Sequence, residues 1–274
     1  PMSQDNSAAG DSRKRRRIEP VPDVFQEPVE SKPSRRIGLA VWLSIGPLLA
    51  IIGLIGFSRL LMGVETSDNF EGGIKPLLHD LALLVTFVTS HTFFARGLGR
   101  KWLNKPFGPA AERPLYVMIS GITLCLLVLL WETSGPMLWT TGNSTLLATS
   151  LVIVQLLGLV LVASSAFVVG AGGLAALPHL RSIESGRPTP KQEFVALPPY
   201  SLIRQPMNLG IVLMLWAMPE VSADRLLLIV ILTLWIAFVA PIEERDAELS
   251  FGDGYTRYKE RTPRWLPKIS VNDS

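Results

Sequence analysis

Long apolar blocks that carry almost no charge constrain this chain most. Hydrophobic residues make up 48% of its 274 residues and charged residues only 18%, whereas soluble domains carry about 25% charged residues. The charges that remain are concentrated in the tails and connections. Because about 20 apolar residues in a helix are enough to cross a bilayer, the sequence predicts a membrane protein and excludes an ordinary soluble domain.

Four long apolar blocks and two shorter ones are the candidate membrane-spanning segments. They cover residues 37–62, 77–94, 115–131, 146–177, 209–218 and 226–240. The two short blocks look like a tight helical hairpin, and neither covers the hydrocarbon core of about 30 Å alone. We therefore expect helical extension into flanking residues or a buried, partly re-entrant pair. The predicted fold is an all-α polytopic membrane helix bundle with five to six transmembrane helices and a cytoplasmic C-terminal region.

The connections between these blocks alternate in charge. Segments 13–36, 95–114, 178–208 and 245–268 are rich in Lys and Arg, whereas 63–76 is acidic and 132–145 has neither Lys nor Arg. Lys and Arg concentrate in cytoplasmic loops. The pattern predicts six crossings with both termini in the cytoplasm, in an inner or plasma membrane.

Residues 1–36 contain five prolines and the basic run 13–17, and they hold no apolar run long enough to bury. Such a composition predicts a disordered cytoplasmic tail. Next to a membrane span, the basic run favours a role in topology and in binding anionic lipid over nucleic-acid binding. The predicted organisation is this tail, transmembrane helices over 37–177, and a C-terminal region over 178–274.

Cysteine and glycine patterns exclude several site classes. Cys125 is the single cysteine, and no His or Cys lies near it at metal-ligand spacing, so we expect neither a disulfide nor a metal site. The run Gly170 to Gly173 lacks the strand-turn-helix context of a dinucleotide loop. Its small residues suit close helix contact.

Polar residues that can carry chemistry lie in three blocks, 200–210, 243–258 and 262–267. A transporter would place charged residues near mid-membrane, so this distribution disfavours one. Arg204 lies at a helix start that Pro206 fixes, where an arginine ordinarily anchors at the interface. Glu243 and Glu244 follow the last apolar run and point to different helix faces. We expect one to be solvated and the other to turn towards Arg204 or a cationic ligand.

The spacing of these motifs resembles the carboxyl half of isoprenylcysteine carboxyl methyltransferase-like membrane enzymes. The matching positions are Arg204, Pro206, Gly210, Glu243, Glu244, Phe251, Gly252, Tyr255, Tyr258, Pro263 and Pro267. The amino half is similar to the NnrU and methanethiol S-methyltransferase branch. This narrower likeness rests on His79, His91, Arg96, Glu112, Arg113, Tyr116 and Trp131. Together the two likenesses cover residues 37–267.

The resemblance implies a membrane methyltransferase that binds S-adenosylmethionine without a Rossmann domain. The implied cofactor-binding residues are Tyr200, Arg204, Gln205, Pro206, Asn208, Gly210, Glu243, Glu244, Tyr255 and Tyr258. This cofactor is a sulfonium cation bearing an amino acid. Arg204 suits its carboxylate, and Glu243 or Glu244 suits its amino or ribose donors. Tyr255 and Tyr258 either close over the adenine or simply pack.

The favoured reaction is S-methylation of a small thiol, with methanethiol giving dimethyl sulfide. The thiolate is the reactive form of a thiol. His91 is the candidate residue for favouring the thiolate form of the acceptor. The other interpretation of His91 is a histidine satisfied by hydrogen bonds inside the bundle. The predicted catalytic residues are His91, Glu244 and Arg204. His79 and Asp80 lie near the other end of the same span, and we expect them only to mark the membrane interface of that span.

One departure from the wider family leaves other functions open. Where that family has Arg-His-Pro-x-Tyr, this chain has Gln205 and Asn208, which form hydrogen bonds but are neither acid nor base. The alternatives are a methyltransferase for a lipid or isoprenylcysteine-type acceptor and a non-catalytic membrane protein that keeps the fold. The predicted partners are a small thiol or membrane-soluble acceptor and the lipid bilayer, without nucleic acid.

Overall fold

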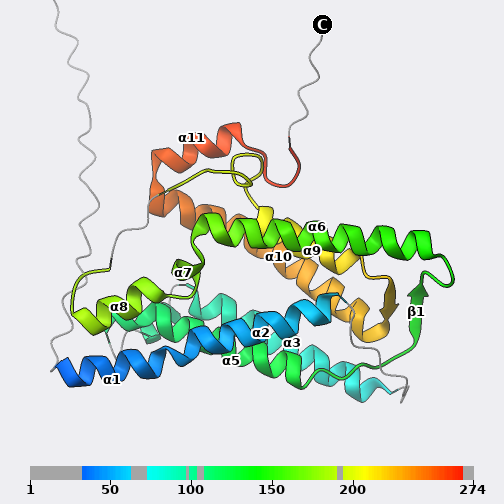
Figure 1. The fold of residues 1–274 in the computed structure, drawn as a ribbon, viewed down its shortest axis with the longest axis horizontal. Coiled ribbons are helices and arrows are strands. Elements are labelled where there is room, and N and C mark those ends of the chain that lie inside the picture. The colour runs from blue at the N-terminus through cyan, green and yellow to red at the C-terminus, as the bar shows by residue number, and fades with distance from the viewer. Residues whose placement is uncertain (1–32, 63–72, 97–98, 104–107, 190–193, 268–274) are drawn as a thin grey trace, which may run out of the picture.

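The computed structural model describes residues 33–62, 73–96, 99–103, 108–189 and 194–267, and nearly all of its regular structure is helical (Figure 1). The longer helices are α1 (Pro33–Leu43), α2 (Ile45–Leu61), α3 (Ile74–Phe94), α5 (Glu112–Leu129), α6 (Thr145–Val169), α9 (Pro206–Trp216) and α10 (Ala223–Phe251). Shorter elements are η1 (Pro109–Ala111), α7 (Ala171–Leu174), α8 (Leu177–Ser185), α11 (Asp253–Arg261), β1 (Met137–Thr140) and β2 (Glu220–Ser222). Residues 1–32, most of the predicted tail, lie outside the described residues.

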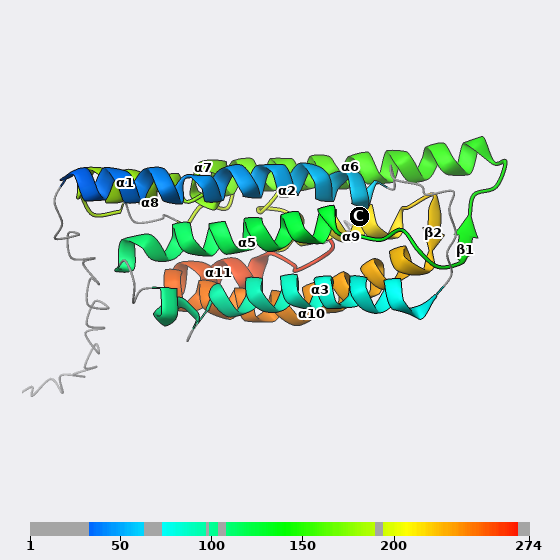
Figure 2. The same cartoon turned by 90° about the horizontal axis from the view of Figure 1, so that it is seen from below.

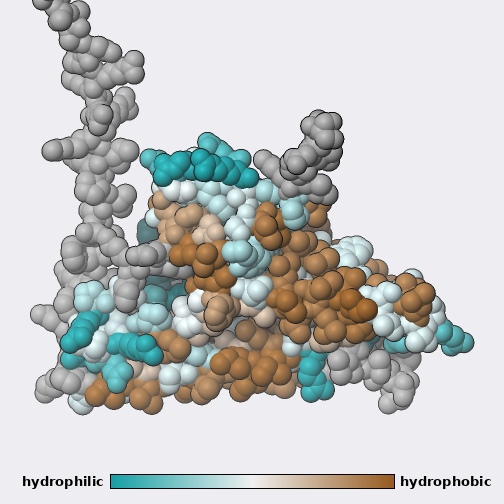
Figure 3. Space-filling model, turned by 45° about the horizontal axis from the view of Figure 1, so that its top comes forward, coloured by the Kyte–Doolittle hydropathy of each residue, from teal (hydrophilic) through white to brown (hydrophobic). Residues whose placement is uncertain are grey.

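Among the described residues, five segments are long and apolar enough to cross a membrane. They are Ser34–Leu61, Ile74–Phe94, Pro109–Leu129, Thr145–Val169 and Ala223–Phe251. Large apolar side chains on them face outward, such as Phe167 at 83% exposure and Phe238 at 67%. Figure 3 shows hydrophobic residues over the bundle and hydrophilic residues gathered on its upper edge. The chain is an integral membrane protein, which confirms the predicted all-α polytopic bundle.

The first span starts earlier than predicted and is interrupted once. Helix α1 begins at Pro33, so residues 33–36 belong to the helix rather than to the tail. Pro47 has no N–H to donate to the carbonyl of Leu43, and α1 accordingly ends at Leu43. Helix α2 resumes at Ile45 in nearly the same direction (Figure 1).

The fourth span ends before its predicted limit at residue 177. Helix α6 stops at Val169 because Gly170 adopts a φ of 89°, which only glycine adopts readily. The predicted close helix contact is not in this glycine run, since nothing lies within 4 Å of a Cβ placed on Gly170 or Gly173. It lies between α6 and α9, where a Cβ on Gly158 or Gly210 would be 2.6 Å from the other residue's carbonyl oxygen.

The predicted hairpin consists of two helices of unequal length. Helix α10 extends beyond its apolar run to 29 residues, whereas α9 keeps only 11. The two helices are antiparallel, because Asn208 hydrogen-bonds Glu243 near one end and Trp216 donates to Thr233 at 3.0 Å near the other. Their connection holds β2, which pairs antiparallel with β1. We did not predict these strands, which are three and four residues long and depend on tertiary pairing.

Neighbouring helices in the bundle follow the order α2, α5, α3, α10, α9, α6 (Figures 1 and 2). Gln155 on α6 is buried, and its Nε2 donates to the carbonyls of Leu61 at 3.0 Å and Met214 at 3.2 Å. It therefore ties α6 to α2 and α9. We call the end of the bundle where α1 and α5 begin and α10 ends the motif end, and the end with β1 and β2 the strand end.

Candidate active site

Glu243 and Glu244 lie near the motif end of α10, and their side chains meet different environments. The Glu244 side chain is 1% exposed inside the bundle. The Glu243 side chain is 45% exposed and lines a cavity. Successive helix residues are about 100° apart, so neighbouring carboxylates face different sides. This confirms the prediction that one turns inward and the other does not.

Two arginines bind the buried carboxylate of Glu244. Nε and Nη2 of Arg204 donate to its oxygens at 2.9 and 3.2 Å, and Nε and Nη2 of Arg264 do so at 3.0 and 2.9 Å. Bidentate pairs of this kind compensate a buried charge well. Sequence reasoning found Arg204 but missed Arg264. The available signal was its place inside the Pro-x-x-x-Pro motif, next to Pro263.

The other donors of Arg204 hold the C-terminal segment. Nη1 donates to the carbonyls of Lys259 at 2.9 Å and Thr262 at 2.5 Å, and the backbone N–H donates to Pro263 at 2.9 Å. Four of the five guanidinium N–H groups are thus used within the protein. We predicted a bidentate pair between Arg204 and the carboxylate of a cofactor. In the structure, Arg204 forms a bidentate pair with the carboxylate of Glu244.

A cavity of about 470 Å³, the aromatic cavity, lies beside Glu243. Its lining comprises Val168, Val169, Phe194, Val195, Tyr200, Arg204, Gln205, Glu243, Ala247, Phe251, Tyr255 and Tyr258. The ring centroids of Tyr255 and Tyr258 are 5.5 Å apart, and Phe194 lies 5.1 Å from Tyr258 and 5.5 Å from Tyr255. The structure therefore brings both predicted tyrosines to one cavity and adds Phe194, which sequence reasoning missed.

The tyrosines of this cavity carry no charge at physiological pH. Burial raises the pKa of Tyr200 to about 12 and that of Tyr255 to about 12. Burial also raises the pKa of Tyr258, whose hydroxyl donates to the carbonyl of Tyr200 at 2.6 Å. The cavity thus offers flat rings and neutral hydroxyl groups next to the carboxylate of Glu243.

The remaining predicted residues of the RQPMNLG segment take three different places. Asn208 Nδ2 donates to Gln205 Oε1 at 2.7 Å and to Glu243 Oε2 at 3.3 Å. Pro206 is buried at the first position of α9. Gly210 lies outside the aromatic cavity and packs against α6.

A second cavity of about 480 Å³, the inner cavity, lies between α2, α3, α5 and α10. Its polar lining residues are His91, Thr92, Arg96, Arg113, Tyr116, Ser120, Glu243 and Asp246. Glu243 lines both cavities. Arg96 Nε donates to Asp246 at 2.7 Å and Arg96 Nη2 lies 4.0 Å from Glu243, so Arg96 fixes this shared wall from the side of α3.

His91 is held inside the inner cavity by a hydrogen bond and three aromatic rings. Its Nε2 lies 2.9 Å from the Tyr116 hydroxyl oxygen. The ring centroids of Phe87, Tyr116 and Trp235 lie 5.3 to 5.6 Å from its own. This geometry is compatible with both interpretations of His91, because the ring has a hydrogen-bond partner within the bundle and also lines the cavity that Glu243 borders.

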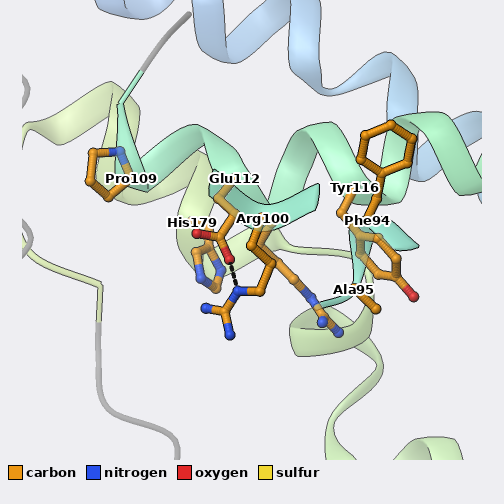
Figure 4. Close-up of a pocket in the computed structure, with 8 residues that line it drawn as sticks. Phe94, Ala95, Arg100, Pro109, Glu112, Tyr116 and His179 are labelled. Atoms are coloured by element: carbon orange, nitrogen blue, oxygen red, sulfur yellow. Dashed lines mark hydrogen bonds and ion pairs between the residues drawn. The ribbon is translucent and has the colours of Figure 1, made fainter. Parts of the chain in front are cut away.

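A smaller recess of about 150 Å³ adjoins the inner cavity at the motif end (Figure 4). Arg100 forms an ion pair with Glu112 there, and His179 lies beside Glu112. Burial lowers the pKa of His179, and the nearby Arg113 lowers it further. Tyr116 lines both this recess and the inner cavity, and its hydroxyl forms the hydrogen bond with His91.

His79 and Asp80 lie towards the strand end, apart from both cavities. Asp80 is fully buried and accepts a hydrogen bond from the backbone N–H of Glu132 at 3.1 Å. Across the described ranges, no group of three or more His, Cys, Asp or Glu side chains is arranged to hold a metal ion.

Comparison with known proteins gives relatives that cover most of the chain. Methanethiol S-methyltransferase 2 of Bradyrhizobium diazoefficiens is 30% identical over 221 residues, which are 81% of this chain and 84% of the relative. Methanethiol S-methyltransferase of Mycobacterium tuberculosis is 30% identical over 192 residues, 69% of this chain and 77% of the relative. Nurim of Bos taurus is 28% identical over 210 residues, 74% of this chain and 80% of nurim. No family model and no solved structure matches.

Proposed function

The chain belongs to the family that contains the methanethiol S-methyltransferases and nurim, and we propose that it is an integral membrane methyltransferase acting on a small thiol. The proposed reaction converts methanethiol to dimethyl sulfide, with S-adenosylmethionine as the methyl donor. The motif end and both chain termini then face the cytoplasm of an inner or plasma membrane, as the charges of the connections predict.

The observation that carries this proposal is the wall that two cavities share at Glu243. Methyl transfer joins two substrates, and its rate depends on holding the acceptor sulfur in line with the donor methyl group. Cavities of about 470 and 480 Å³ are within the usual range for small-molecule sites. Two such cavities that meet at one carboxylate supply neighbouring places for donor and acceptor.

The residues of the aromatic cavity fit S-adenosylmethionine. Tyr255 and Tyr258 provide flat rings for an adenine. The carboxylate of Glu243 and the ring faces favour a sulfonium cation. The Gln205 amide nitrogen and the fifth N–H of Arg204 are donors for an amino acid carboxylate. When bound, S-adenosylmethionine supplies an activated methyl group.

On the acceptor side, His91 and Tyr116 handle the thiol proton. The thiolate is the nucleophile, so a base near the sulfur is required, and His91 is assigned this role with Tyr116 as its hydrogen-bond partner at 2.9 Å. Arg96 and Arg113 line the same cavity and favour the negative charge on sulfur. The aromatic rings around His91 exclude water from the reacting atoms.

The other predicted site residues have supporting roles in this proposal. Gln205 and Asn208 orient Glu243 through the hydrogen bonds that join the three side chains. Arg204 and Glu244 position α11 and the segment after it over the aromatic cavity, because their bonds tie α9, α10 and residues 259–264 together.

The test uses the purified full chain in detergent with methyl-labelled S-adenosylmethionine and methanethiol. We expect labelled dimethyl sulfide in the headspace, together with saturable binding of S-adenosylmethionine to the same sample. Binding without methylation of methanethiol or of any other thiol would favour a non-catalytic membrane protein. Absence of binding would refute the assigned donor site.

A further inference from the structure

The inner cavity is much larger than methanethiol requires. A cavity of about 150 Å³ is enough to hold benzene, whereas the inner cavity measures about 480 Å³ and methanethiol has only two non-hydrogen atoms. The following inference rests on the proposed function and concerns the class of thiol that this cavity accepts.

The lining of the inner cavity changes from charged to apolar along three helices. On α5 it runs from Arg113 to Leu124, which is about 16 Å at 1.5 Å per residue. On α3 it runs from Arg96 through His91 to Phe87. On α10 it runs from Asp246 through Glu243 to Val239. In each case the charged residues lie at the motif end and the apolar ones deeper in the span, as an amphipathic ligand would require.

The deep end of the cavity is closed by α2. Leu54 lines it there near the level of Leu124 of α5, whereas Ala50 packs against Gly121 about one turn nearer the motif end. Leu54 is 58% exposed on the outer surface of the bundle. The apolar end of the cavity therefore borders the outer, lipid-facing surface of the bundle.

Polar groups for a thiol lie between these two ends. The Ser120 hydroxyl is buried in the cavity wall, one helical turn from Tyr116 on α5. His91 is on the facing helix α3, and Glu243 closes the cavity towards the aromatic cavity. A sulfur atom at this level is next to the proposed base and the donor site, with about one helical turn of lining below it, down to Phe87, Leu124 and Val239.

We propose that this enzyme methylates thiols with longer alkyl chains, with the chain in the apolar end and the sulfur between His91 and Glu243. The acceptor sulfur forms the new bond to the methyl carbon as the sulfonium carbon–sulfur bond of the donor breaks. The thiol proton leaves to His91 and then to solvent. The products are an alkyl methyl sulfide and S-adenosylhomocysteine.

The experiment compares methanethiol, 1-butanethiol and 1-octanethiol as acceptors for the full chain in detergent. Each buried methylene group favours binding by about fourfold, so kcat/KM should rise with chain length, after correction for partition of each thiol into micelles. A second readout is thermal unfolding without donor, in which octyl methyl sulfide should raise the Tm more than dimethyl sulfide does.

Leu54→Trp fills the deep end, and Leu234→Trp makes the same change on the exposed outer face of α10, outside the cavity. Leu54→Trp should lower the ratio of kcat/KM for 1-octanethiol to that for methanethiol at least tenfold and abolish the extra Tm shift. Leu234→Trp should leave both readouts unchanged.

Two outcomes separate the failure of this inference from failure of the proposed function. Turnover of methanethiol, with neither turnover of nor stabilisation by the octyl compounds, would overturn the inference and leave the proposed function standing. Stabilisation by octyl methyl sulfide that is lost in Leu54→Trp, with no thiol methylated, would support the binding site and refute the reaction.

Discussion

At the scale of single residues, two neighbouring carboxylates on α10 have different roles, because Glu244 stabilises the fold and Glu243 faces the proposed ligand sites. Glu244 is enclosed by two bidentate arginines and accepts four hydrogen bonds from them. Glu243 keeps an exposed carboxylate that Asn208 orients and that lines both cavities. A buried charge must be compensated, whereas a charge that meets a cationic ligand must stay accessible.

Glu243→Gln should therefore lower activity, whereas Glu244→Gln should lower stability. In Glu243→Gln we expect kcat/KM for methyl transfer to fall about 100-fold with little change in thermal stability, because the sulfonium loses its counter-charge while the fold keeps its contacts. Methyl-transfer kinetics and thermal unfolding on the same preparation check this result.

In Glu244→Gln we expect a loss of about 3 kcal/mol of stability, because Arg204 and Arg264 then lose the charge that they enclose. The two adjacent variants are matched controls for each other. Equal and small effects in both assays would contradict the division between the two residues.

At the scale of elements, close contact between α6 and α9 positions the short helix of the hairpin. Helix α9 has only 11 residues and is too short to cross the bilayer alone. Gly158 and Gly210 let its backbone approach α6, and Gln155 bonds to the carbonyl of Met214 on α9. These contacts fix the middle and the end of α9 against α6, and the first turn of the same helix carries Asn208 to Glu243.

Gly210→Ala should weaken this contact. A Cβ at this position would lie 2.6 Å from the carbonyl oxygen of Gly158, which is backbone and cannot rotate away. We expect a loss of about 1–3 kcal/mol of stability and weaker binding of S-adenosylmethionine. Gly173→Ala is the matched control, because nothing lies within 4 Å of its Cβ position. Thermal unfolding that is identical for the two variants would argue against the contact.

At the scale of the whole molecule, the charged lining of both cavities lies towards the motif end, and the inner cavity reaches past the middle of α5 to Leu124. Their lining residues come from α2 onward, and α11 with the segment after it covers the aromatic cavity. Among the described residues, five segments are long enough to cross a membrane, and the 11-residue α9 is a shorter apolar helix beside them.

Deleting residues 2–30 should leave methyl transfer in detergent within about twofold of the full chain. The deletion ends before α1, and no described residue of either cavity precedes Ala50. The measurement is kcat/KM for methanethiol, with the amount of inserted protein determined in parallel. A tenfold loss with normal insertion would show that the tail acts on the site.

The sequence by itself determined the membrane class, the positions of the long spans and the opposed faces of Glu243 and Glu244. These features follow from local rules, because apolar runs of this length avoid water and successive helix residues are about 100° apart. The motif spacing also pointed to Arg204, to both tyrosines of α11 and to His91.

Only the tertiary structure decided which partners these residues meet. Arg264 binds Glu244 from 20 residues away, Asn208 reaches Glu243 from 35 and Tyr116 reaches His91 from 25. The helix contact at Gly210, the pairing of β1 with β2 and the meeting of two cavities at Glu243 likewise join segments that are distant in sequence. Such pairings depend on how the helices pack against one another, and the periodicity of each segment alone carries no record of them.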